Sequence, residues 1–60
     1  MMKKLDLYMI VWATKNIENV KKGMVGTIVH VNSEDSFEVE FPGYGAVTVD
    51  RDDISLDYPS

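Results

Sequence analysis

Two glycines three residues apart lead into a strand made almost wholly of β-branched residues at positions 23–31, which read Gly-Met-Val-Gly-Thr-Ile-Val-His-Val. Gly23 permits a tight turn at the entry, and Gly26 permits a close backbone approach or a β-bulge. Ile28 and Val31 are three residues apart, so both side chains reach the same core only if the strand bends between them. A bent strand of this kind is what a small, strongly curved β-barrel requires.

The clearest predicted strand, at residues 37–41, alternates strictly between apolar and acidic residues. Phe37, Val39 and Phe41 therefore point to one face of a sheet, whereas Glu38 and Glu40 point to the other. One face is core and the other faces water, as in an antiparallel sheet that is buried on one side. Further inward-pointing residues are expected near the end of the chain, at Val47, Val49, Ile54 and Leu56.

The rest of the chain reads as short strands separated by turn residues. Residues 14–22 are polar, with Ile17 and Val20 as their only apolar anchors, and predict a long loop wrapped over the core. We expect turns and one 3₁₀ turn between strands at 5–13, 27–31, 37–41, 46–50 and 55–58. The predicted fold is all-β: a small SH3-like barrel of about five antiparallel strands, with one short 3₁₀ turn (50–53) before the last strand, in a single domain spanning residues 1–60.

The order of these segments resembles that of known domains. The stretch at 23–31 is similar to the glycine-containing strand of KOW-type and other SH3-like domains, in which a loop delivers Gly-x-x-Gly into a bent strand. Nearly the whole chain also resembles a family of small bacterial proteins of unknown function. Its aspartate and apolar strand corresponds to 6–12, and its Gly-x-x-Gly strand to 23–29. Its Tyr/Phe-x-Val-Glu-Phe strand corresponds to 37–41, and its Asp-Asp-Leu-like turn to 52–54. The resemblance implies an SH3-like barrel and no particular biochemistry.

The two halves of the chain carry opposite charge, although the net charge is only −4. Residues 1–30 hold five lysines against two acids, and residues 31–60 hold one arginine against eight acids. The acidic half disfavours nucleic-acid binding, which needs a basic surface. An alternative reading remains: an RNA- or ribosome-associated KOW-like module that uses Lys15, Lys21, Lys22 and the loop at 23–26.

The chain shows no catalytic or metal-binding constellation. There is no cysteine, and His30 is the single histidine, whereas zinc sites usually need three or four His, Cys or acidic ligands. We expect His30 to face outward from its strand, and no serine has an evident claim on it as a base. The acids Asp50, Asp52, Asp53 and Asp57 read as a solvated turn. The sequence therefore predicts no enzyme, no cofactor and no metal.

Aromatic residues are the strongest candidates for an interaction surface. In a strand at 5–13, Tyr8, Ile10 and Trp12 share the face opposite Leu7, Met9, Val11 and Ala13. Tyr44 and Tyr58 are candidates to join them in one patch, and Glu38 and Glu40 to attract a basic partner. Two alternatives stay open: Tyr8 and Trp12 either complete the core or form an interface, with another protein or with a second copy of the chain.

The apolar stretch at 5–13 is far too short to span a membrane, and Asp6 interrupts it without a small-residue cleavage site after it. We therefore expect a cytoplasmic protein with no membrane association. The predicted function is that of a non-enzymatic interaction module, such as an accessory, immunity or antitoxin-like subunit that docks on a protein partner or on a second copy of itself.

Overall fold

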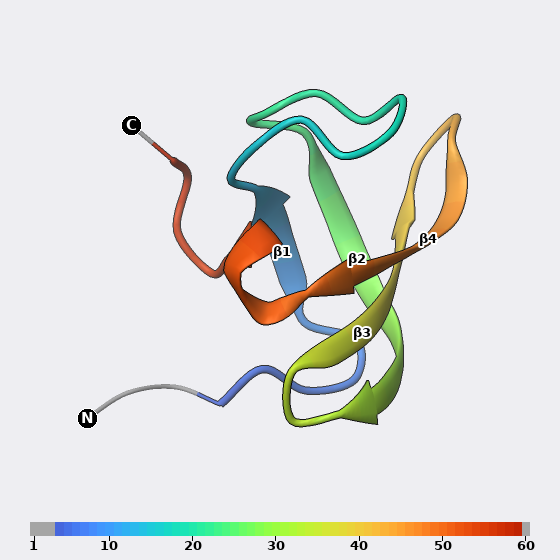
Figure 1. The fold of residues 1–60 in the computed structure, drawn as a ribbon, viewed down its shortest axis with the longest axis vertical. Coiled ribbons are helices and arrows are strands. Elements are labelled where there is room, and N and C mark those ends of the chain that lie inside the picture. The colour runs from blue at the N-terminus through green and yellow to red at the C-terminus, as the bar shows by residue number, and fades with distance from the viewer. Residues whose placement is uncertain (1–3, 60) are drawn as a thin grey trace.

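The computed structural model describes residues 4–59, which form five antiparallel strands and one 3₁₀ turn and contain no α-helix. In chain order the elements are β1 (Ile10–Ala13), β2 (Val25–Ser33), β3 (Ser36–Phe41), β4 (Gly45–Asp50), η1 (Arg51–Asp53) and β5 (Ile54–Ser55) (Figure 1). The predicted all-β class and the 3₁₀ turn before the last strand are confirmed. Within residues 4–59, no helix has the length and apolar character needed to cross a membrane.

The strands lie in one sheet in the order β4-β3-β2-β1-β5. Its two end strands, β4 and β5, are joined by the three residues of η1. In a flat sheet these strands would lie about 19 Å apart, whereas the connection reaches at most about 15 Å. The sheet must therefore curl, and Figure 1 shows β4 crossing in front of β2. Within residues 4–59, β4 and β5 are not paired with each other, so the sheet is not closed into a complete barrel.

The inner face of the curled sheet carries the core. Phe37, Val39 and Phe41 of β3 are at most 1% exposed, as the alternation predicts. Ten apolar residues from all five strands and the first loop form one buried cluster, namely Val11, Ala13, Val20, Ile28, Phe37, Val39, Phe41, Val47, Val49 and Ile54. Leu56, expected inward, is only partly buried against this cluster.

Gly26 lies fully inside β2, beneath β3. A Cβ atom at this position would lie 2.7 Å from Val39 Cγ1 and 2.9 Å from the Glu40 carbonyl oxygen, so only glycine fits without displacement. The pairing with β3 shifts register just after Ile28, and Val31 packs against the core on the far side of the shift. The predicted bend is confirmed, in a strand that is longer than expected.

The loop at 14–22 is anchored at its middle and at its start. Val20 is fully buried, and the backbone N–H and carbonyl groups of Ile17 and Val20 exchange two hydrogen bonds of 2.8 Å. The Thr14 hydroxyl donates to the Asp52 carbonyl at 2.7 Å, which fastens the loop to η1. The loop thus covers the core as expected.

The first and last strands are shorter than predicted. β1 begins at Ile10 rather than at residue 5, because the Asp6 carboxylate accepts a 2.8 Å bond from the Leu7 N–H and Tyr8 turns the chain with a φ of 66°. Leu7, which would share the face of Val11 and Ala13 in a strand at 5–13, is 43% exposed. The last strand comprises Ile54–Ser55 rather than 55–58.

Candidate interaction surface

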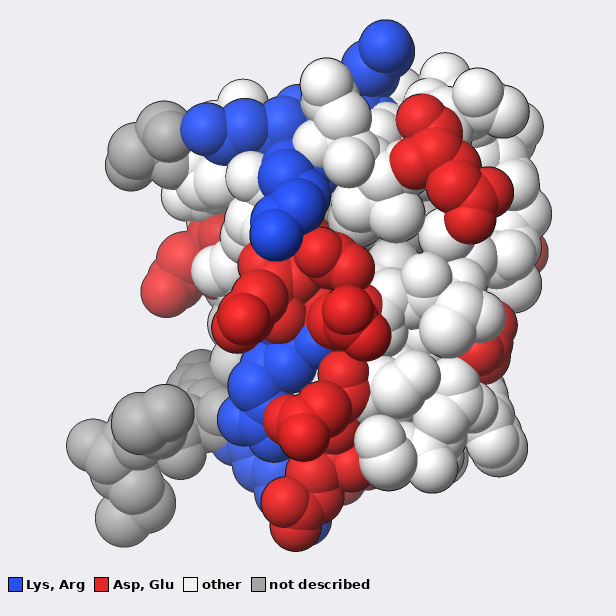
Figure 2. Space-filling model, viewed as in Figure 1, with Lys and Arg blue, Asp and Glu red and all other residues white. Residues whose placement is uncertain are grey.

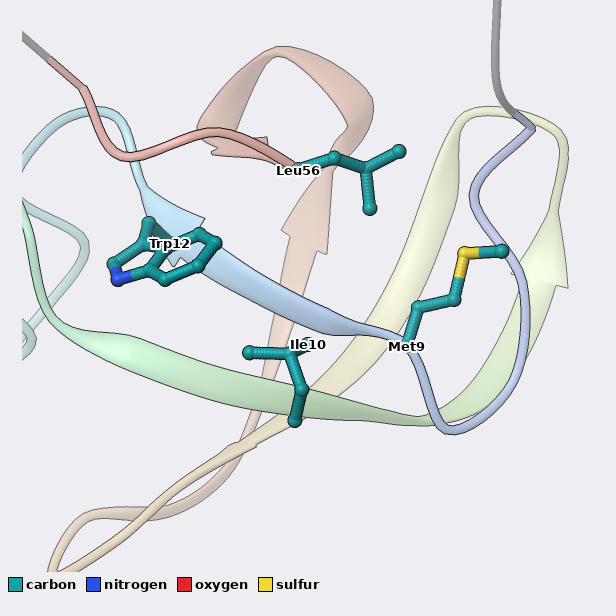
Figure 3. Close-up of a pocket in the computed structure, with 4 residues that line it drawn as sticks. All are labelled: Met9, Ile10, Trp12 and Leu56. Carbon is teal, nitrogen blue, oxygen red and sulfur yellow. The ribbon is translucent and has the colours of Figure 1, made fainter.

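The outer face of β1 carries an open apolar groove. Val11 and Ala13 point into the core, so the alternation of the strand turns Ile10 and Trp12 outward. With Met9 before the strand and Leu56 after β5, they line a groove of about 290 Å³ (Figure 3). Ile10 is 50% exposed, so the groove presents apolar surface to solvent.

Trp12 is held against its neighbours at one end of this groove. It pairs with Val25 of β2 on one side and with Ser55 of β5 on the other. Its ring meets the ring of Tyr58 edge to face, with centroids 6.4 Å apart and planes at 82°. A Cβ atom at Gly23 would lie 3.4 Å from the Tyr58 hydroxyl oxygen, so the Tyr58 ring packs against the turn at Gly23. Trp12 belongs to the outer face and not to the core cluster.

Tyr8 and Tyr44 lie outside the residues that line the groove. Tyr8 is 75% exposed, so the alternative in which it completes the core is wrong. Its φ of 66° is strained for a bulky residue and costs about 1–2 kcal/mol. Tyr44 lies in the turn between β3 and β4. The structure therefore brings Trp12 together with Ile10 and Tyr58, and does not join Tyr8 or Tyr44 to them.

Glu38 and Glu40 both face outward from β3, as predicted, but their surroundings differ. Glu38 is half-buried, and its Oε2 accepts hydrogen bonds of 2.7 Å from the Asn32 amide and from the Thr48 hydroxyl. The Asn32 bond first, and the Thr48 bond second, lower the pKa of the Glu38 carboxyl below its ordinary value. Its cross-strand neighbour His30 adds a smaller attraction and is exposed, as expected. Glu40 is exposed and offers the freer carboxylate.

An acidic band runs over η1 and the turn between β2 and β3 (Figure 2). Two cations interrupt it. The Arg51 guanidinium lies 3.4 Å from the Asp35 carboxylate and donates to the Glu34 carbonyl at 2.6 Å, and Lys15 Nζ lies 3.4 Å from Asp53 Oδ1. Among residues 4–59, no group of three His, Cys or acidic side chains is arranged to hold a metal ion.

Two lining residues of the groove are missed by the sequence pattern. Leu56 was expected to point into the core, and Met9 was placed on the strand face of Val11 and Ala13; both are instead partly buried at the margin of the core. They lie at opposite ends of the chain and meet only because β5 pairs with β1. The apolar character of both residues is a signal, but their proximity depends on a two-residue strand.

No protein-family model matches this chain, and neither the curated proteins nor the solved structures contain a match. The resemblance to KOW-type domains and to the small bacterial family therefore stays a prediction. What the chain does has to be argued from its own surfaces.

Proposed function

We propose that this chain is a non-enzymatic protein-interaction module built on an SH3-like barrel. The strand order β4-β3-β2-β1-β5 and the three-residue link between the end strands support a half-closed barrel, because the link holds the two edges of the sheet together at one end. The long first loop, whose Val20 is buried, covers the core as a barrel of this size requires.

The observation that carries the proposal is the apolar groove on β1. Its Ile10 is half exposed, and Tyr58, whose ring meets that of Trp12 edge to face, is 69% exposed. Protein interfaces are enriched in aromatic residues that fill pockets, and such anchors contribute most of the binding free energy. A partner side chain seated between Ile10 and Trp12 would remove this surface from water.

The charge pattern supports a partner with basic residues around its contact site. The exposed carboxylates of the acidic band and Glu40 favour approach of a positive surface, which affects the association rate and orientation more than the affinity. An accessory, immunity or antitoxin-like subunit that docks on another protein fits these properties.

The RNA-binding alternative has less support. Gly26 is buried inside β2, and the Gly23 N–H already donates to the Ala13 carbonyl at 2.8 Å, so neither glycine offers a free N–H to a phosphate. Lys15 is paired with Asp53 at the margin of the acidic band. A flat titration with single-stranded RNA at low salt is therefore expected.

Affinity capture from the native lysate tests the proposal. The wild type is compared with Ile10→Glu in the groove and with Val29→Glu, a matched change at another exposed apolar residue that does not line the groove. We expect the wild type and Val29→Glu to capture the same protein in similar amounts. Ile10→Glu should capture about tenfold less of it, or none, because a buried charge opposes docking. Equal capture by all three folded proteins would contradict the proposal.

A further inference from the structure

The free edge of β4 presents a defined set of unpaired backbone groups. Beyond the end of β4, the Arg51 N–H donates to the Asp35 carbonyl at 2.9 Å, which marks this pair as hydrogen-bonded. The β3–β4 pairing continues from there without a register shift. Hydrogen-bonded and non-bonded pairs alternate in an antiparallel ladder, so Val49 and Val47 bond to β3. The N–H and carbonyl groups of the alternate residues point away from β3.

Those alternate residues are Ala46, Thr48 and Asp50, and all three are exposed. The Asp50 N–H is already satisfied, since it donates to the Asp53 carboxylate at 2.9 Å. The N–H and carbonyl groups of Ala46 and Thr48 have no backbone partner in the described part of the chain. The edge is thus open at two residues and capped at its end.

This edge lacks the features that usually prevent strand pairing. Edge strands are commonly protected by lysine, proline, a bulge or a covering segment. β4 contains neither lysine nor proline, and its pairing with β3 shows no bulge. Figure 2 shows that the surface over β4 is largely uncharged, in contrast to the acidic band over η1.

We propose that two copies of this chain pair through their β4 edges, antiparallel and about a two-fold axis at Val47. In this register Ala46 lies opposite Thr48 of the second copy, and the two residues exchange N–H to carbonyl bonds on both sides of the axis. All four open groups of each edge are satisfied. A register centred on Thr48 would instead leave the Ala46 carbonyl without a donor, because the Asp50 N–H is occupied.

Charge also favours this arrangement of two identical strands. The only charged residue of β4 is Asp50, at its end. The two-fold pairing sets Asp50 opposite Tyr44 of the second copy, so the two aspartates lie at opposite ends of the interface. Parallel pairing would place like charges side by side, which is unfavourable. The β4 edge and the groove share no residue, since Met9, Ile10, Trp12 and Leu56 line the groove, so the inference does not depend on the proposed function.

Cysteine cross-linking tests this register, since the chain contains no cysteine of its own. A hydrogen-bonded pair has Cα atoms about 5.5 Å apart, which suits a disulfide. We therefore expect Ala46→Cys mixed with Thr48→Cys to form a mixed disulfide dimer under oxidation. Each variant alone places its two cysteines about 7–8 Å apart, beyond ready bridging.

Sedimentation equilibrium from about 10 µM to about 1 mM gives the second readout. We expect the wild-type mass to rise toward twice the 6.8 kDa of one chain. Ala46→Pro should remain monomeric, because it removes an N–H that the second copy needs. This N–H faces away from β3, so its loss leaves the β3–β4 hydrogen bonds intact. The proposal is overturned if the wild type stays monomeric and the mixed disulfide forms no more readily than the disulfide of either variant alone. The β4 edge would then be a site for an extended segment of another protein. If Ala46→Pro fails to fold, the cysteine mixture decides alone.

Discussion

At the scale of single residues, Gly26 sets the distance between β2 and β3. Its missing side chain lets the Glu40 carbonyl and the side chains of Val39 and Phe41 approach to within 2.9 Å of where a Cβ would lie. Proteins fill their interiors to crystal-like density, so such a contact leaves no room for a methyl group. Gly43 differs: its φ is 87°, and its surroundings are open.

Gly26→Ala should therefore cost much more stability than Gly43→Ala. We expect a loss of about 2–3 kcal/mol for Gly26→Ala from overpacking, which is most of what a domain of this size has. Gly43→Ala should lose about 1–2 kcal/mol, through its positive φ alone. Urea denaturation of both variants measures the difference, and equal losses would mean that β2 and β3 do not approach so closely.

Glu38 links stability to pH. Hydrogen bonds from Asn32 and Thr48 hold its folded-state pKa below the ordinary value of 4.5, so the carboxylate stabilises the fold above that pH. This contribution is lost as pH falls through the lowered pKa. The stability difference between the wild type and Glu38→Gln should be constant near neutral pH and shrink below pH 4.5.

Denaturant titrations at several pH values measure this profile for Glu38→Gln. Thr48→Val removes one of the two hydrogen bonds to the carboxylate, so it should reproduce part of the same pH dependence. A stability difference that stays unchanged through the acid range would show that Glu38 has no lowered pKa in the folded protein.

At the scale of elements, the strands with strong local patterns are the ones that the sequence predicts well. β3 alternates strictly, and both its bounds and its inward residues agree with prediction within one residue. Residues 5–13 are apolar apart from Asp6 and lack such alternation. A side-chain bond at Asp6 and a positive φ at Tyr8 end the strand there, and both depend on contacts that composition does not encode.

The groove was predictable in part. Strand alternation places Ile10 and Trp12 on one face, but the sequence left open whether that face completes the core or faces outward, and the burial of Val11 and Ala13 decides for the outward direction. Met9 and Leu56 complete the groove only because β5 pairs beside β1. Two residues are too few for a periodic signal, so this long-range pairing had to come from the structure.

At the scale of the whole molecule, the chain has one thin core and an outer surface that is acidic over η1 and apolar along β1. A domain of this length buries only about 60% of the surface that its unfolded chain exposes. Burial of the β1 groove by a partner would add to its stability through binding linkage. We therefore expect the outer face of β1 to be an interface in the cell.

Site-specific photo-cross-linking tests whether a partner binds the outer face of β1. A photoreactive phenylalanine analogue replaces Ile10 in the groove, or Val29 as the matched exposed control. We predict a discrete cross-linked partner from position 10 and none from position 29 after illumination of intact cells. No cross-link from position 10, or the same product from both positions, would contradict it.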